Sequence, residues 1–366
     1  MANVAELLGV QKEAMAMCLK MKYVQMGRGS MVAIQLSSAV AAETRDSLCK
    51  HLYGNMFDFI VQKINASMRT PNAKFFIGIL DIFGFEVFEQ NTFEQLCINY
   101  ANEKLQFHFN GKALIAYTVR LLFFTPLIVL LADVIFSEEK RLYNEEGIPT
   151  EHITFVDNSE CVKLIEDKPF GLIVILDEEC SLGNGTDAKY ISKIDSFFGI
   201  NKQKANAFFV KHRTKQYFFS VKHFAGPVEY NVISWVEKNR DTLNETIKDT
   251  LKTSSRELIC KLFTDSGKAA AAGTKAAKIT LGSQFRSQLI GLIDKIHSTE
   301  PHFIRCIKPN SEKVPMKLDG VLALRQLRYA GLFEAIRIRK SGFAYRSVHS
   351  IFANTFQELV DGTCQL

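Results

Sequence analysis

The chain has 366 residues, of which 47% are hydrophobic and 23% are charged, so its composition is that of a globular protein and not of a disordered one. The net charge of +6 permits an acidic partner but requires none, and it does not indicate nucleic-acid binding. Eight cysteines occur without CxxC pairs or Cys/His clusters, so neither a disulfide framework nor a zinc site is indicated, and reduced thiols in the cytoplasm are expected. No basic-then-apolar segment follows Met1, so no secretory signal is predicted.

Helical segments are predicted before residue 75. Residues 1–25 predict a helix and a turn. Residues 45–65 predict an amphipathic helix, and we expect it to pack beneath the strand that follows. Its apolar side chains recur at helical spacing: Leu48, Leu52, Met56, Phe57 and Ile60.

The stretch at 75–110 is the most informative part of the chain. It opens with FFIGIL, an apolar run rich in β-forming residues that predicts a buried strand at 75–80. Next comes DIFGFE, which places Asp81 at the end of that strand and Gly84 three residues later. From Phe93 onward the apolar residues return at helical spacing and predict a long helix.

Strand, acidic–glycine turn and helix together indicate a segment that senses the state of a bound nucleotide. Asp81 can hold the water shell of a metal ion. The amide of Gly84 can approach a phosphate closely, because glycine has no Cβ. A DxxG pattern is weak evidence by itself, and the alternative is a strand–loop–helix unit with an unrelated aspartate.

An almost wholly apolar segment, GKALIAYTVRLLFFTPLIVLLA at 111–132, interrupts the predicted helix. Its length suits a membrane span, but Arg120 and Pro126 lie inside it, and a span would separate two halves of one helix. A real insertion and a retained intron are the alternatives to a span. We favour the intron, because both ends of the segment can be encoded with donor-like and acceptor-like splice sequences.

The whole of 75–110 closely resembles the switch II loop and relay helix of the myosin motor domain, down to DIFGFE and NEKLQ. The resemblance covers nearly all of the chain apart from 111–133. It implies a helix-rich α/β fold: a partial P-loop-NTPase-type myosin motor core with an incomplete central sheet, because the family's middle strand is missing. Further matching segments follow in family order: AELLGV at 5–10, NEEGI at 144–148, FVDN at 155–158, LIEDKPFG at 164–171, ILDEEC at 175–180 and VKHFAGPVEY at 221–230.

The resemblance implies an ATP site with Mg²⁺ as its metal. Asp81 would lie near the Mg²⁺ water shell, Gly84 would offer its amide to the γ-phosphate, and Glu86 would pair with an arginine of switch I. The 366 residues contain no GxxxxGK[ST] phosphate-binding loop and no switch I. Phosphoryl transfer needs all these parts positioned together, so we expect that the chain alone does not hydrolyse ATP.

The resemblance also implies a surface for actin filaments. Residues 26–39 match an actin-facing surface loop, in which Ser30 occupies a position where myosins carry an acid or a phosphorylatable hydroxyl; an unmodified loop serine is the alternative. Residues 191–213 match an apolar actin contact, are predicted as a helix–loop–helix, and include Phe197 and Phe198. Ordinary surface helices are the alternative for this segment.

A shift in composition to Ala, Gly and Lys predicts a flexible loop at 264–280. It falls where myosins carry loop 2, whose lysines meet the acidic surface of actin. Lys268, Lys275 and Lys278 are the corresponding residues, and their attraction to actin would be salt-sensitive; a generic linker is the alternative. TSSR at 253–256 mimics switch I, but it lacks the preceding residues of that motif, and we predict a plain helix there.

The last part of the chain resembles the connection between the motor core and the lever. Residues 302–310, HFIRCIKPN, predict a second core strand. Gly331 and Gly342 are the predicted hinges, because glycine absorbs large dihedral changes. The expected domain organisation is 1–74, helices and the actin-facing loop; 75–110, switch II and relay helix; 111–133, the apolar insertion; 134–262, the lower actin-binding region; 263–282, the flexible loop; 283–325, a helix and core strand; 326–341, the connecting helices; and 342–366, the start of the converter.

From this resemblance we expect a fragment of an actin-based myosin motor that couples the ATP state to actin binding and lever movement, in the cytoplasm and on the cytoskeleton. Its partners would be actin filaments and the missing N-terminal half of the motor. Light chains, nucleic acid and membranes are not expected as partners. A stand-alone actin-binding module without ATPase activity is the alternative, and an incomplete gene model of a full motor is a third hypothesis.

Long-read sequencing of the native transcript tests the retained-intron hypothesis. We expect the mature message to lack the codons for 111–132 and to extend upstream into a phosphate-binding loop. Reads that contain the apolar stretch at full abundance would sink the hypothesis.

Overall fold

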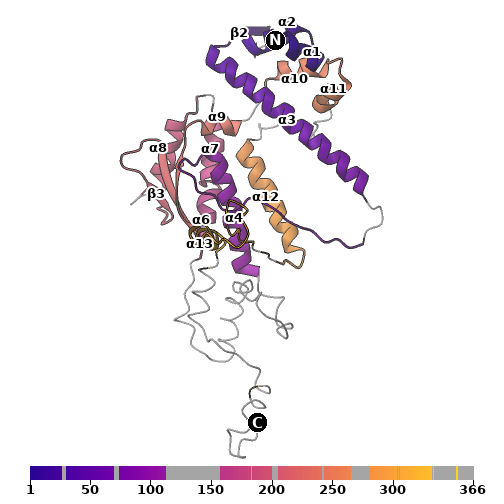
Figure 1. Ribbon diagram of the computed structural model, residues 1–366. Helices are drawn as coiled ribbons and strands as arrows, with labels where there is room; N and C mark the ends of the chain where they lie inside the picture. Colours follow the sequence, from indigo (N-terminus) through magenta and orange to yellow (C-terminus); the bar gives the residue numbers. More distant parts are fainter. Residues whose placement is uncertain are drawn as a thin grey trace, which may run out of the picture. The chain divides into compact units, whose positions relative to one another are not determined.

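Helices form most of the regular structure (Figure 1). This computed structural model describes residues 1–26, 30–69, 74–112, 157–182, 184–199, 205–240, 243–264, 280–302, 304, 306–331, 333 and 352. The chain divides into two units, which are described separately below. The first is Met1–Asp81 with Glu237–Leu281, and the second is Ile82–Val236 with Gly282–Leu366.

The first unit combines helices with one antiparallel hairpin. Its elements are α1 (Ala2–Leu8), α2 (Lys12–Lys20), β1 (Met21–Met26), β2 (Ser30–Gln35), α3 (Ser38–Met68), α10 (Glu245–Lys252) and α11 (Glu257–Thr264). Helices α2 and α10 come from distant parts of the sequence and close a small core together. Four of its side chains are almost fully buried: Met15, Cys18, Ile247 and Leu251.

One expectation for the first unit is wrong, and another gains detail. Residues 30–35 of the surface loop expected at 26–39 form β2, which pairs antiparallel with β1 along its whole length. Ser30 therefore begins a strand, and its side chain lies outside the described part of the chain. The segment 253–256 is not helical but connects α10 to α11, where the Ser254 hydroxyl donates to the Leu8 carbonyl at 2.6 Å.

Helix α3 confirms the helix predicted at 45–65 and extends beyond it at both ends. Its predicted apolar face is only partly covered. Leu48 is buried, whereas Phe57 is 57% exposed. The expectation that this face packs beneath a strand at 75–80 is wrong, because that strand does not form.

Neither predicted core strand is present among the residues that the structure describes. Residues 75–80 are irregular, and the side chains of Phe75, Ile77 and Ile79 are 91%, 98% and 94% exposed. The described residues of 302–310 are also irregular. A strand must satisfy its N–H and C=O groups by pairing, and no described strand pairs with either segment. This irregular and exposed apolar run agrees with the expectation of an incomplete central sheet and is a candidate site of aggregation.

The second unit packs helices against one small sheet. Its helices are α4 (Phe93–Lys112), α6 (Ser159–Glu166), α7 (Leu172–Ser181), α8 (Asp187–Phe198), α12 (Leu281–His297) and α13 (Gly320–Tyr329), and α9 (Trp235–Arg240) leads out of it. The antiparallel strands β3 (Phe209–Lys211), β4 (Phe218–His223) and β5 (Gly226–Asn231) form the sheet in that order. The helix–loop–helix predicted at 191–213 is wrong in its second half, which contains β3.

The core of the second unit includes α4 and one face of the sheet. Phe219 pairs with Tyr230 and Val221 with Val228, so the alternation of the strands places these four buried side chains on one face. Helix α4 contacts α6 and β5 and begins at Phe93, as predicted. The apolar positions predicted from its spacing are all buried: Phe93, Leu96, Cys97, Tyr100 and Ala101.

Asn91 connects the chain before α4 to the sheet through hydrogen bonds. Its side-chain amide donates to the carbonyls of Phe88 and Glu229 at 3.0 and 2.9 Å, and its Oδ1 accepts from the Phe88 amide at 2.8 Å. Its own carbonyl accepts from the Asn231 amide at 2.9 Å. Asn91 is 3% exposed, so water has little access to replace these bonds.

The substitution Asn91→Ala should lower the free energy of unfolding by about 1–3 kcal/mol, because buried backbone groups of the loop and the sheet would lose their partners. Asn206→Ala is the control: Asn206 also bonds nearby backbone groups but is partly open to water, and we expect a change within about 0.5 kcal/mol. Chemical denaturation followed by circular dichroism measures both values. Equal losses in the two variants would contradict the role of Asn91.

Candidate functional site

The loop that precedes α4, which contains the predicted switch II residues, is bound to α4 through its backbone. The Glu86 amide donates to Asn99 Oδ1 at 2.8 Å, and Asn99 Nδ2 donates back to the Glu86 carbonyl at 2.8 Å. Asn102 Nδ2 donates to the Phe83 carbonyl at 3.0 Å. Residues 99 and 102 are three apart and therefore lie on one side of α4, so this side of the helix holds the loop at two points.

Asp81 and Gly84 leave room for a ligand. Both lie in irregular, exposed chain, and Asp81 makes no hydrogen bond or ion pair with any residue that the structure describes. A Cβ added at Gly84 would meet no atom within 4 Å, so the space beside its backbone is open. A metal-bound water and a phosphate oxygen could therefore approach these residues, which fits one part of an ATP and Mg²⁺ site. Glu86 is half-buried and could still receive a cationic partner.

Phe85 anchors the same loop to the interior. It is 6% exposed, and its ring lies 5.2 Å from the His223 ring and 5.4 Å from the Phe224 ring, both close to edge-to-face. Its ring is also 5.5 Å from that of Tyr329, at the end of α13. The loop therefore contacts α4 through the backbone of Phe83 and Glu86, and it contacts the sheet and α13 through the ring of Phe85.

Beneath the loop, Glu103 of α4 forms the centre of a buried polar network. Its Oε1 accepts from the Phe224 amide at 2.8 Å and lies 3.0 Å from His223 Nδ1. Its Oε2 accepts from Asn158 Nδ2 at 2.6 Å. The side chains of Glu103 and His223 are fully inaccessible to solvent. A buried carboxylate requires such partners, because it has lost those that water would provide.

Tyr230 links this network to the loop. Its hydroxyl accepts from Asn99 Nδ2 at 2.9 Å and lies 2.8 Å from His223 Nε2. Burial raises the pKa of Tyr230 well above its ordinary value, so the hydroxyl keeps its proton and can donate it to Nε2. We therefore assign a proton to His223 Nδ1, which donates to Glu103. One chain of hydrogen bonds then runs from Glu86 through Asn99, Tyr230 and His223 to Glu103.

The same network contains donor types that bind metals. Ligand atoms of Glu103, Cys161 and His223 lie within 4.8 Å of one another, and all three residues are buried. Thiolate, imidazole and carboxylate are the ligands of Zn²⁺ in proteins. However, Glu103 already accepts hydrogen bonds at both oxygens, and burial raises the pKa of the Cys161 thiol, so the thiol keeps its proton. We interpret this cluster as a hydrogen-bonded hub.

The hub residues were not among the predicted site residues, although the sequence carries signals for them. Glu103 lies three residues after the buried Tyr100 and therefore on the apolar face of α4, where a charged side chain requires a partner. His223 follows Phe219 and Val221 at two-residue spacing along β4. A buried acid and a buried histidine were thus detectable, but their pairing was not.

The predicted actin-contact residues on α8 differ in accessibility. Phe198 is 6% exposed, because its ring packs against that of Phe209 at 5.8 Å. Phe197 is half-buried and contacts the ring of Phe170 at 4.8 Å. Phe197 is therefore the residue of this pair that offers an apolar surface, and Phe198 belongs to the core.

Gly331, a predicted hinge, has a backbone conformation that favours glycine. Its φ is +74°, in the left-handed region, directly after the end of α13. A Cβ at this position would lie 3.0 Å from Gln106 Oε1 of α4. Both the backbone conformation and the close approach to α4 favour glycine here.

Some predicted features lie outside the described residues: Lys268, Lys275, Lys278, Gly342 and the greater part of the apolar segment, 113–132. Within the described ranges, no helix combines the length and the apolar character that crossing a membrane requires.

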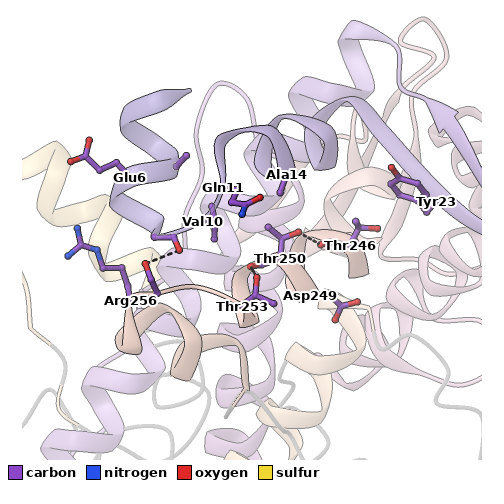
Figure 2. Close-up of a pocket in the computed structure, with 13 residues that line it drawn as sticks. Glu6, Val10, Gln11, Ala14, Tyr23, Thr246, Asp249, Thr250, Thr253 and Arg256 are labelled. Carbon is purple, nitrogen blue, oxygen red and sulfur yellow. Dashed lines mark hydrogen bonds between the residues drawn. The ribbon is translucent and has the colours of Figure 1, made fainter.

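A pocket of about 1310 Å³ opens on the first unit, where the end of α1 and the start of α2 face α10 (Figure 2). Some of the polar groups that line it already form hydrogen bonds within the protein: the Thr250 hydroxyl donates to the Thr246 carbonyl at 2.8 Å. Asp249 is paired with Lys252 at 3.1 Å, and the remaining lining charges, Glu6 and Arg256, are opposite in sign, so the wall favours neither anions nor cations. None of the predicted site residues lines this pocket, and we assign no role to it.

Comparison with known proteins gives consistent matches over nearly the whole chain. The family model described as "Myosin head (motor domain)" matches residues 1–118 and 127–365, and it leaves out 119–126, within the apolar segment, and the last residue. "Myosin-I heavy chain" of Dictyostelium discoideum is 39% identical over 357 residues, which cover 96% of this chain and 14% of that protein. "Myosin-2" of Arabidopsis thaliana is 36% identical over 361 residues, which cover 97% and 27%. "Unconventional myosin-Vb" of Homo sapiens is 36% identical over 385 residues, which cover 98% and 19%. The chain therefore spans 14% to 27% of the length of these relatives.

Thiol labelling at pH 8 tests the burial of the hub and of α4. Burial, with the nearby carboxylates of Glu94 and Asp177, raises the pKa of Cys97 to about 12, and Cys161 is shifted in the same direction. Because the thiolate is the reactive form, both should react at least about a hundredfold more slowly than exposed Cys49 and Cys306.

Mass spectrometry of the labelled peptides measures these rates, and labelling in denaturant, where all four thiols should react alike, is the control. A folded chain in which Cys161 reacts as fast as Cys49 would contradict the burial of the hub.

Proposed function

Because this chain belongs to the myosin head (motor domain) family, we propose that it forms the part of an actin-based motor that reads the ATP state and passes it to the lever. The chain spans a minor part of its relatives' length, so the motor activity, the nucleotide and actin are proposed for a motor that contains it. In such a motor, the loop before α4 would be switch II and α4 would be the relay helix.

The attachment of this loop to α4 is the observation that carries the proposal. Asn99 holds both backbone groups of Glu86, and Asn102 holds the carbonyl of Phe83. Hydrogen bonds weaken steeply with distance and misalignment, so α4 must follow a shift of the loop or lose these bonds. Further along the same side of α4, Gln106 lies against Gly331, so movement of α4 would reach the end of α13 and the hinge there.

Asp81, Gly84 and Glu86 would form the sensor. Asp81 would hold a water of the Mg²⁺ shell, the Gly84 amide would donate to the γ-phosphate, and Glu86 would pair with an arginine of switch I. When bound, ATP with Mg²⁺ would supply the charges to which these residues respond. The open space at Gly84 and the exposed carboxylate of Asp81 support this assignment.

Two kinds of group would contact actin, one apolar and one basic. Phe197 on α8 would supply an accessible apolar edge. Lys268, Lys275 and Lys278 would attract the acidic surface of the filament. Phosphorylation of Ser30 would add nearly two negative charges and thereby change this attraction.

A stand-alone actin-binding module that does not hydrolyse ATP is the second candidate. It is favoured by one observation: the 366 residues contain no GxxxxGK[ST] loop and therefore no nest of amides and no lysine for the β-phosphate. Both candidates predict binding to filaments, and they differ in the response to ATP once the sequence is part of a larger motor.

Co-sedimentation of the 366-residue chain with actin filaments tests the proposal. We expect binding that weakens with salt, does not respond to ATP and is accompanied by no ATP hydrolysis. Replacing Lys268, Lys275 and Lys278 by alanine together should weaken binding by roughly tenfold at low salt.

The control replaces three other lysines, which form short ion pairs on α10 and α11, by alanine: Lys248, Lys252 and Lys261. This variant carries the same change in net charge and should bind almost as well as the unchanged chain. If the chain does not sediment with filaments at any salt concentration, the actin-binding part of the proposal is refuted. If ATP releases the chain from filaments, the chain has a competent nucleotide site, contrary to our expectation.

A further inference from the structure

We propose that Tyr230 is a positioning residue that couples α8 to the predicted switch II segment. Its ring ends a ladder of aromatic side chains that starts on α8, and its hydroxyl starts the hydrogen bonds that reach the backbone of Glu86. The inference rests on the proposed function for its meaning, since α8 would face actin and Glu86 would belong to the nucleotide sensor. All the contacts that carry it lie within the second unit.

The aromatic ladder consists of Phe198, Phe209, Phe219 and Tyr230. Successive ring centroids are 5.8, 5.8 and 5.6 Å apart, and the middle pair is stacked at 23°. Each of these residues is at most 7% exposed. Protein interiors are close-packed, so a displacement of α8 must either move the neighbouring rings or open a cavity. The ladder therefore transmits a displacement of α8 to the ring of Tyr230.

The hydroxyl of Tyr230 has no alternative partners in solvent. It accepts from Asn99 Nδ2 at 2.9 Å and lies 2.8 Å from His223 Nε2, and both Tyr230 and Asn99 have no exposed surface. Asn99 exchanges two hydrogen bonds with Glu86, each 2.8 Å long. A shift of the hydroxyl must therefore move Asn99 or leave its Nδ2 group with one bond fewer, and either change loosens the Glu86 backbone.

The same unit offers two matched residues that lack this connection. Tyr190 is as deeply buried as Tyr230, but its hydroxyl donates to the Leu172 carbonyl at 3.2 Å. Phe170 is a partly buried ring that packs against Phe197 at 4.8 Å, outside the ladder. If substitutions acted through a general loss of stability, those at Tyr190 and Phe170 would change the exchange of the Glu86 amide as much as those at Tyr230 and Phe198. Positioning predicts that only the substitutions in the ladder change it.

Hydrogen exchange of the Glu86 amide in the 366-residue chain measures this coupling directly, because that amide donates to Asn99. Tyr230→Phe removes only the hydroxyl and should raise the exchange rate in peptides that cover Glu86 by roughly five- to tenfold, the effect of one buried hydrogen bond. Phe198→Leu, at the far end of the ladder, should raise it by roughly two- to threefold. Tyr190→Phe and Phe170→Leu should leave it unchanged.

The double variant Tyr230→Phe with Phe198→Leu provides the decisive comparison. If the two residues act through one path, the effects should not multiply. Adding Phe198→Leu to Tyr230→Phe should then raise the exchange rate by a smaller factor than Phe198→Leu does in the otherwise unchanged chain. The proposal would be overturned by any of three results: effects of the two substitutions that multiply, no effect of Phe198→Leu, or control variants that raise the exchange rate equally. Circular dichroism verifies that each variant is folded, and Phe209→Leu, the next ring of the ladder, replaces Phe198→Leu if that variant does not fold.

This experiment uses neither actin nor ATP. Its failure would therefore refute the coupling through Tyr230 and leave the proposed function intact. Conversely, a chain that does not bind actin filaments could still show the predicted exchange rates, in which case the coupling would stand without that function.

Discussion

The buried carboxylate of Glu103 is the constraint on which the second unit depends. It binds groups from three elements besides its own helix: the amide of Phe224 at the β4–β5 turn, the ring of His223 on β4 and the side chain of Asn158 before α6. Removing any one of these partners would leave part of a carboxylate unsatisfied in the interior, which is among the costliest defects in a folded protein. The relative positions of α4, α6 and the sheet are therefore tied to one side chain.

The loop before α4 is attached to this rigid arrangement at several points, although it has no regular structure of its own. Phe85 inserts its ring between the sheet and the end of α13, while the backbone on either side is bound by Asn99 and Asn102. Asp81 and Gly84 remain exposed on its outer side. The loop therefore combines a bound part, held by Asn99, Asn102 and the ring contacts of Phe85, with residues that are open to solvent.

The segment 75–80 shows the opposite situation. Its residues have the composition of a buried strand, yet among the described elements no strand pairs with it, and its large apolar side chains face solvent. β-Structure depends on hydrogen bonds to a neighbouring strand, whereas a helix satisfies its backbone within its own segment. For the same reason α4 and α3 form as predicted, whereas the described residues of the two predicted core strands are irregular.

The sequence by itself determined the local periodicities and the family. The spacing of apolar residues from Phe93 onward defined α4, and DIFGFE with NEKLQ pointed to the myosin motor domain, because these signals are contained in contiguous residues. Only the tertiary structure decided which polar groups meet. Glu103 and His223 are 120 residues apart, and Asn99 and Tyr230 are 131 apart, so no local pattern specifies that they bind. It also decided that Phe198 lies in the core, because burial depends on the residues that a fold brings to the opposite side.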